Sequence, residues 1–274
     1  MRVKPADDLI MPKLPEASEP NHRRRVLLQQ RLGLVAFVLA VWALASMNAP
    51  AFVLPSPARV WQATLGLMAS PTFLADVGVT FGRVLAGFLF AAVIGTVMGM
   101  VLGANRKLGE FFEPILAVMN TISSAIWAIF ALIWFGLSNW TTIFVVFMTA
   151  FPLVLTNVWQ GTRTVNVEFI ELAHTFRMSR FQVLRKVYLP TILPHFFSGA
   201  RLAFGFGWRV SLVAETLGAS SGIGYRLRQA ADLVQTDQVF AWTLMLVLMM
   251  VVIESVVLKP LERRLFRWKK PSSP

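Results

Sequence analysis

Long apolar runs separated by short charged connections are the main pattern of this sequence. A helix needs about 20 mostly apolar residues to cross the hydrocarbon layer of a bilayer. Six runs approach this length: residues 32–54, 84–104, 115–135, 141–159, 196–217 and 239–258. Strands of a membrane barrel alternate in polarity over about ten residues, so continuous runs of this length predict helices. The pattern predicts an all-α, polytopic membrane protein with about six transmembrane helices.

Composition supports a bilayer rather than an aqueous environment. Hydrophobic residues make up 56% of the chain and charged residues 15%, against about 45–50% and about 25% in soluble domains. The formal net charge of +12 could suggest nucleic acid, but the basic residues lie in the connections and form no groove-like patch. We therefore expect no nucleic-acid partner. The absence of cysteine excludes disulfides and cysteine-ligated metals, and no metal site is expected.

The distribution of Lys and Arg predicts the orientation of the chain. Most of the 26 basic residues lie in the N-terminal segment, after the second and fourth runs, and in the C-terminal tail. Few lie on the opposite side: Arg59, Arg226 and Arg228, with Arg83 at its edge. Both termini are therefore predicted to be cytoplasmic.

The predicted organisation has three parts. Residues 1–31 are expected to form a disordered tail, residues 32–258 the transmembrane domain, and residues 259–274 a basic tail. Residues 58–68 predict a short helix on the outer surface.

The connection at residues 160–195 is basic and amphipathic. Within residues 167–178, four apolar residues have the spacing of one helical face: Phe169, Ile170, Ala173 and Phe176. Pro190 and Pro194 predict a break before the fifth run. Periodicity fits equally a helix on the membrane surface and a helix that enters a groove on a soluble partner.

Residues 171–190 resemble the EAA loop of the permease subunits of ATP-binding-cassette (ABC) importers. The family pattern is Glu-Ala-Ala, three residues, Gly, nine residues, an aliphatic residue, any residue, then Leu-Pro. The matching residues here are Glu171, Ala173, Val187, Leu189 and Pro190. Leu172 replaces the second residue of the pattern, and Arg177 replaces a glycine that permits a sharp turn. Because positive φ is disfavoured for other residues, either the turn differs or Arg177 adds a contact to the partner.

The resemblance covers about residues 50–268. Residues 54–57 (LPSP), 132–136 (LIWFG) and 217–225 (LGASSGIGY) are similar to the subclass that imports sulfonates, taurine, nitrate and related compounds. In that subclass the third span is rich in proline and arginine is common at one position. Other residues stand at these places here: Asn120, Thr121, Ser123, Ser124 and Ile129. We therefore expect a less kinked third span. These departures leave the identity of the substrate open.

The resemblance implies the type I ABC importer permease fold, in a bacterial inner membrane and working as a homodimer. It also implies two partners, a cytoplasmic ATPase subunit and a periplasmic or lipid-anchored substrate-binding protein that would face residues 58–68 and 218–237. The chain has no G-x-x-x-x-G-K-[ST] phosphate loop, so it is not expected to be an enzyme. ATP and Mg would bind to the ATPase, and no cofactor to this chain. Five residues are implied as the ATPase contact: Glu171, Leu172, Ala173, Phe176 and Arg177.

The fifth run contains Arg201, Arg209 and Glu215. A charge at the centre of a membrane helix costs about 2.5–3.5 kcal/mol on insertion scales, so such residues face protein or a water-filled cavity. Arg201 lies near the cytoplasmic end and can snorkel. The candidates for the translocation path are Trp127, Trp208, Arg209 and Glu215. For Arg209 and Glu215 the alternative is a structural ion pair or an interhelical hydrogen bond.

Two other classes of function share features with this sequence. A secondary transporter driven by an ion gradient often has internal repeats and broken helices around midplane charges, and this sequence shows no convincing repeat. An intramembrane hydrolase is suggested by residues 218–222, which match G-x-S-x-G. However, His22, His174 and His195 are predicted on the other side of a bilayer about 30 Å thick, so a catalytic triad cannot form.

Overall fold

The computed structural model describes residues 20–258 and residue 260 of the 274-residue chain. Every regular element in this part of the chain is helical. The chain divides into two compact units, Met1–Pro57 and Ala58–Pro274, and each is described by itself.

The first unit contains helix α1, which spans Pro20–Met47. Proline suits the first turn of a helix because its missing N–H is not needed there. The prediction of a disordered tail is therefore wrong for residues 20–31, while residues 1–19 lie outside the described residues. The indole nitrogen of Trp42 donates a hydrogen bond to the carbonyl oxygen of Pro55 at 3.1 Å, which fixes the chain after the helix.

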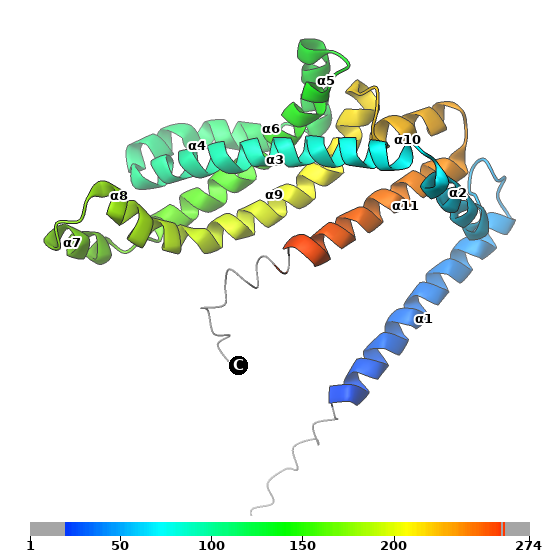
Figure 1. Ribbon diagram of the computed structural model, residues 1–274, viewed down its shortest axis with the longest axis horizontal. Coiled ribbons are helices and arrows are strands. Elements are labelled where there is room, and N and C mark those ends of the chain that lie inside the picture. Colours follow the sequence, from blue (N-terminus) through cyan, green and yellow to red (C-terminus); the bar gives the residue numbers. More distant parts are fainter. Residues whose placement is uncertain (1–19, 259, 261–274) are drawn as a thin grey trace, which may run out of the picture. The chain divides into compact units, whose positions relative to one another are not determined.

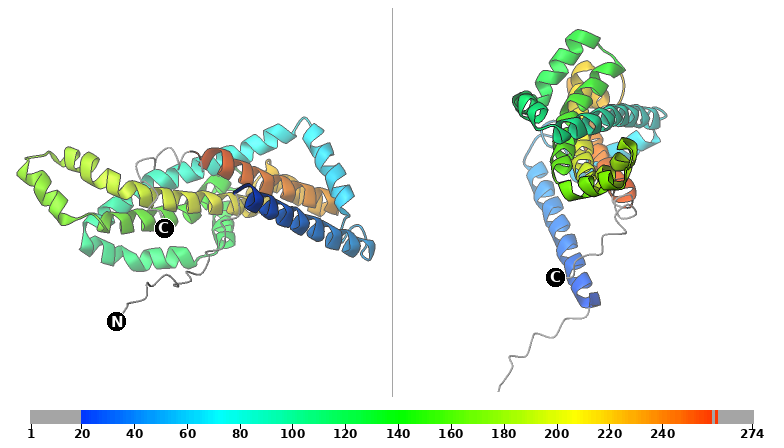
Figure 2. Two further views of the ribbon diagram at one scale, coloured as in Figure 1. Left: turned by 90° about the horizontal axis from the view of Figure 1, so that it is seen from below. Right: turned by 90° about the vertical axis from the view of Figure 1, so that its left-hand side faces the viewer.

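The second unit is built around three long helices: α3 (Phe73–Ala104), α6 (Asn139–Arg163) and α9 (Leu189–Gly218). They lie side by side, with α6 in contact with both of the others (Figure 1; Figure 2). Six further elements complete this unit outside the α6–α9 connection described below: α2 (Pro57–Ala69), α4 (Arg106–Thr121), α5 (Ser124–Phe135), α10 (Ile223–Asp232), α11 (Thr236–Ile253) and the π-helix η2 (Glu254–Leu258). Helix α2 confirms the short helix expected at residues 58–68.

A stripe of small residues lets α3 approach α6 closely. It runs along one face of α3 at intervals of four residues: Gly87, Ala91, Gly95, Gly99 and Gly103. A Cβ atom at Gly99 would lie 2.8 Å from the carbonyl oxygen of Leu155, so no larger residue fits at this contact. Membrane helices lack a hydrophobic driving force for association, and close contact between small residues supplies van der Waals energy instead.

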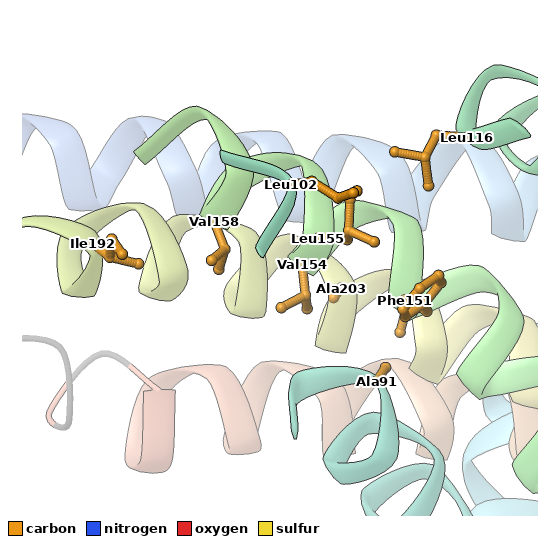
Figure 3. Close-up of a cluster of buried hydrophobic side chains, with 10 residues drawn as sticks. Ala91, Leu102, Leu116, Phe151, Val154, Leu155, Val158, Ile192 and Ala203 are labelled. Atoms are coloured by element: carbon orange, nitrogen blue, oxygen red, sulfur yellow. The ribbon is translucent and has the colours of Figure 1, made fainter. Parts of the chain in front are cut away.

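The largest buried cluster fills the space between α3, α4, α6 and α9 (Figure 3). Phe151, Val154, Leu155 and Val158 come from α6, and Ala203 comes from α9. Because α6 supplies side chains toward both neighbours, it is the central helix of the unit.

The third predicted span is two helices, α4 (Arg106–Thr121) and α5 (Ser124–Phe135), bent by 91°. The expectation of a less kinked span is therefore wrong. Polar side chains produce the break without proline: the Thr121 hydroxyl donates to the carbonyl oxygen of Ala117 at 2.8 Å, and the Ser123 hydroxyl accepts from the backbone N–H of Ala125 at 3.3 Å. Serine and threonine favour helix ends because their side chains replace backbone hydrogen bonds.

The connection between α6 and α9 contains three short helices: α7 (Val167–Thr175), α8 (Arg180–Val183) and the π-helix η1 (Leu184–Tyr188). The prediction of a break before the fifth run is wrong: the backbone stays helical from α8 through η1 into α9, with Pro190 in the first turn of α9 and Pro194 inside it. The π-helical turn η1 lies directly before these prolines.

By length and composition, four helices in the described part of the chain can cross a membrane: residues Gln29–Met47, Phe73–Ala104, Asn139–Arg163 and Thr236–Val256. Counting the bent pair of α4 and α5 as one span gives five, one fewer than the predicted six. Helix α9, the fifth predicted span, is not among them. Arg201, Arg209 and Glu215 lower its hydropathy, and its packing against α6 gives these polar positions protein neighbours.

Candidate coupling loop and buried charge network

The turn after α7 keeps a left-handed conformation although arginine occupies it. Arg177 has φ of +50°, in the region that glycine adopts most readily. The backbone N–H of Met178 donates to the carbonyl oxygen of Ala173 at 3.0 Å, which is the six-to-one hydrogen bond of a Schellman helix end. The sharp turn expected of glycine is therefore present, and Arg177 adds a charged side chain to it.

Helix α7 presents one apolar face outward. Phe169, Leu172 and Phe176 are exposed, Phe176 to 69%, whereas Ala173 is only 4% exposed. Glu171 and Arg177 are also exposed beside this face. Four of the five predicted contact residues can therefore reach a partner directly, and Ala173 instead packs inside the chain. We call Phe169, Glu171, Leu172, Phe176 and Arg177 the coupling surface.

The chain after this turn is held by a capping box. The Ser179 hydroxyl accepts from the backbone N–H of Gln182 at 3.3 Å, and the Gln182 side chain accepts from the backbone N–H of Ser179 at 2.8 Å. This reciprocal pair satisfies two donors that a helix start leaves unbonded. Helix α8 thus begins at a defined residue directly after the coupling surface.

A second polar feature is centred on Glu215 of α9, whose side chain is fully buried. Nη1 of Arg83 donates to Oε1 of Glu215 at 2.8 Å. The Thr80 hydroxyl and the backbone N–H of Gly224 both donate to Oε2 at 2.9 Å. Both carboxylate oxygens therefore have partners, as a buried charge requires.

Arg83 of α3 is 4% exposed and connects α3, α6 and the segment before α10. Its Nε and Nη2 donate to Oδ1 of Asn139 at 2.9 and 2.6 Å. Ser221 accepts from Nη1 through its carbonyl oxygen at 2.7 Å and from Nη2 through its hydroxyl at 2.9 Å. All three guanidinium nitrogens are bonded, which is the geometry for which arginine is suited.

Asp76 extends the network toward α10. Its Oδ2 accepts from Nε of Arg226 at 2.7 Å, and its Oδ1 accepts from the backbone N–H of Gly222 at 3.0 Å. Gly222 has φ of +101°, and a Cβ atom there would lie 2.8 Å from the Glu215 carboxylate oxygens. Glycine is therefore required where the chain passes over the buried charges. We call Asp76, Thr80, Arg83, Asn139, Glu215, Ser221 and Arg226 the charge network.

Glu215 was a predicted path candidate, whereas its hydrogen-bond partners were not predicted. Asp76, Thr80 and Arg83 are spaced by four and three residues in the first turns of an otherwise apolar helix. That spacing places polar side chains on one helical face, and it is the signal that could have pointed to a common polar neighbour.

The candidates for the translocation path differ in exposure. Trp127, Trp208 and Glu215 are buried, whereas Arg209 is exposed. The Trp208 indole donates to the carbonyl oxygen of Leu246 at 3.3 Å, and Glu215 has the interhelical ion pair that was the alternative to a path role. The guanidinium of Arg209 lies 5.8 Å from the centre of the Phe206 ring, within reach of a cation–π contact. A path role stays a prediction for all four, and exposure favours Arg209.

A further ion pair joins α9 to η2. Nη2 of Arg201 donates to Oε1 of Glu254 at 2.8 Å. A cavity of about 230 Å³ adjoins this pair, and Arg201, Arg209, Phe206 and Met250 contribute to its wall. An exposed arginine thus lies beside a cavity on a helix that was predicted to cross the membrane.

The helical membrane-spanning architecture, the amphipathic connector and the buried charges define a polytopic transport subunit. The chain belongs to the family of binding-protein-dependent transport system inner membrane components, whose pattern matches residues 91–265. This confirms the predicted class, the permease subunit of an ABC importer in the inner membrane, and gives no support to a secondary transporter.

Characterised and solved relatives agree with this assignment. The chain is 29% identical over 249 residues to the putative aliphatic sulfonates transport permease protein SsuC of Bacillus subtilis, covering 90% of each chain. It is 26% identical over 245 residues to the taurine transport system permease protein TauC of Escherichia coli, covering 86% of this chain and 88% of that protein. A chain of the inward-facing MetNI methionine ABC transporter superposes with a TM-score of 0.61 at 20% identity, over 72% of this chain and 99% of that one. The last likeness confirms the fold.

Proposed function

We propose that this chain forms the translocation path of an ABC importer and receives its driving force through the coupling surface. The observation that carries the proposal is the exposed apolar face of α7, with Phe169, Leu172 and Phe176 uncovered. An amphipathic helix of this kind fits a groove on a protein partner, with apolar residues as anchors and charges at the rim. The partner we propose is a cytoplasmic ATPase, which binds ATP and Mg.

The proposed assembly is a homodimer with two copies of the ATPase and a substrate-binding protein on the opposite side of the membrane. Both termini and the coupling surface face the cytoplasm. Nucleotide-driven closure of the ATPases moves the two coupling surfaces and shifts the spans between inward-facing and outward-facing arrangements, because each partner binds the two arrangements with different affinity.

Co-purification with the ATPase tests this proposal. We expect Glu171→Lys to reduce ATPase retention and substrate uptake by about tenfold, because reversal of a rim charge opposes a complementary surface. Glu113→Lys is the matched control: Glu113 is also exposed but lies on α4, and it should retain the ATPase. Unchanged retention in Glu171→Lys would exclude α7 as the docking helix.

For the substrate we propose a small organic anion that passes Arg209. Two observations support this: Arg209 is exposed on α9 beside a cavity, and relatives are named for aliphatic sulfonates and taurine. A charge at membrane depth normally faces a polar pathway rather than lipid. A guanidinium there lowers the cost of bringing an anion out of water.

Uptake by reconstituted transporter measures the role of Arg209. Arg209→Gln should lower uptake of an anionic substrate by about tenfold while leaving ATPase retention unchanged, and Arg209→Lys should keep part of the uptake because the charge remains. Equal uptake by Arg209→Gln and the parent protein would remove Arg209 from the path.

A further inference from the structure

An apolar groove of about 520 Å³ lies between the cytoplasmic-side end of α3 and the loop that carries the coupling surface. One wall is made by Val97, Val101 and Ala104 of α3. The other wall includes Ile170 of α7 and Leu184 and Tyr188 of η1. We call this the loop groove. Its volume lies within the range of about 300–1,000 Å³ that small-ligand sites occupy.

The loop groove and the coupling surface lie on different sides of α7. Ile170 lines the groove, whereas Phe169, Leu172 and Phe176 do not. Val97 and Val101 are exposed side chains on a helix long and apolar enough to span the membrane, so the α3 wall of the groove continues into the lipid-facing surface. An acyl chain can therefore enter from the bilayer while the coupling surface stays free for the ATPase.

The positive charge at the groove favours lipids with anionic head groups. Arg180 is its one charged lining residue, and no carboxylate lines it among the described residues. Arg185 and Lys186 are exposed in the following π-helical turn. Basic residues beside a cytoplasmic-side pocket favour anionic head groups, and the planar guanidinium matches a phosphate in geometry.

A π-helical turn forms part of the groove wall. A π-helical turn is rare and is frequently found at functional sites. Leu184 and Tyr188 of η1 both line the groove, directly before the chain enters α9. A molecule bound here would contact α3, α7 and the turn that leads into the N-terminus of α9.

We propose that the loop groove binds an anionic phospholipid, with an acyl chain along α3 and the phosphate at Arg180. The inference rests on the proposed cytoplasmic placement of the loop, where anionic lipids contact basic segments. Because the lipid joins α3 to the coupling loop, it holds the coupling surface in place. The lipid composition of the membrane then regulates the transfer of movement from the ATPase.

The first test is native mass spectrometry of the purified full chain titrated with dioleoyl phosphatidylglycerol or dioleoyl phosphatidylcholine, without the ATPase. One arginine near the membrane surface corresponds to about a fivefold preference for the anionic lipid. Arg180→Gln should remove that preference. Arg163→Gln is the matched control: Arg163 is exposed at the end of α6 and does not line the groove, so this variant should keep the preference. Equal binding of the two lipids by the parent chain would overturn the proposal.

A second test measures occupancy at the groove itself. The chain contains no cysteine, so Phe181→Cys provides one site for a fluorescent label beside Arg180. Phosphatidylglycerol with brominated acyl chains should quench this label, and Val101→Trp, which fills the groove, should abolish the quenching. If Val101→Trp leaves quenching unchanged but prevents ATPase retention, a protein partner occupies the groove and the lipid proposal is wrong. Glu171→Lys should lose ATPase retention and keep lipid binding, because it changes the coupling surface and leaves the loop groove intact. ATPase docking and lipid binding can therefore fail independently of each other.

Discussion

Two arginines illustrate two ways in which this chain uses charge. Arg177 in the coupling surface is exposed, and its backbone adopts a conformation that glycine favours. Arg83 in the charge network is buried, and each of its side-chain nitrogens donates a hydrogen bond. Arg177 is accessible to a partner, whereas every side-chain nitrogen of Arg83 is bonded within the chain. Exposure leaves a charge available for docking, and full hydrogen bonding gives it a structural role.

The charge network and the coupling loop also differ in how they are held to the rest of the chain. The charge network joins α3, α6 and α9 to the segment 219–222 through hydrogen bonds between side chains from all four. In the coupling loop, Ala173 is buried, and the capping box at Ser179 joins neighbouring residues of the loop itself. The proposed transport mechanism uses both features: a bonded group of helices that carries the movement and a surface that receives it.

Breaking the charge network should have the largest effect. Arg83→Met leaves the Glu215 carboxylate buried without its cation, and removal of one partner of a buried pair costs about 3–5 kcal/mol. We expect the free energy of unfolding in detergent micelles to fall by that amount.

The double variant Arg83→Met with Glu215→Met is the matched control. Replacing both charges by apolar groups avoids the uncompensated charge, so most of the loss should be recovered. If the single and double variants are equally destabilised, the ion pair is not the source of the effect.

Gly222→Ala should have the next largest effect. The residue has φ of +101°, and a Cβ atom would lie 2.8 Å from Thr80 Oγ1 as well as from the Glu215 carboxylate. Strain of this type costs about 1–3 kcal/mol, measurable as a lower midpoint of thermal unfolding. Gly78→Ala is the control because its Cβ would meet nothing within 4 Å, and it should be neutral or slightly stabilising.

Arg177→Gly should change stability in the opposite direction. A residue other than glycine in the left-handed conformation costs roughly 1–2 kcal/mol of stability, which glycine would recover. Part of this recovered stability is lost because glycine has greater conformational freedom in the unfolded chain. We expect the unfolding free energy to rise by up to about 1 kcal/mol. Val234, which has φ of +57°, provides a parallel case, and Val234→Gly should stabilise more because the replaced residue is β-branched. No gain in either variant would show that the two turns carry no strain.

The spans could be predicted because long apolar runs are a local property of the sequence. Runs 84–104 and 141–159 correspond to the larger helices α3 and α6. The bend between Thr121 and Ser124 was missed because it depends on side-chain hydrogen bonds to the backbone rather than on proline. The start of α1 at Pro20 was missed because a polar segment was interpreted as disordered.

The site was predicted unevenly for the same reason. The coupling loop is one continuous segment, so its motif could be found, whereas only the structure shows that Arg177 keeps the left-handed turn. The partners of Glu215 lie on α3, more than a hundred residues away, and no single segment reveals them. Sequence reasoning identified the carboxylate as unusual, but only the fold shows that Arg83 and Thr80 satisfy it.

Phe176→Ala should have the smallest effect on stability. It should nevertheless distinguish the coupling surface from the charge network most clearly, because it affects ATPase retention rather than folding. Exposed side chains contribute little to folding, so the unfolding free energy should change by less than about 0.5 kcal/mol. ATPase retention should fall by about tenfold or more, because an aromatic anchor at the centre of an interface carries much of its binding energy. Phe111→Ala is the matched control: Phe111 is 68% exposed against 69% for Phe176, but it lies on α4. Equal loss of retention in both variants would show that exposed aromatic surface in general, rather than the position of α7, determines docking.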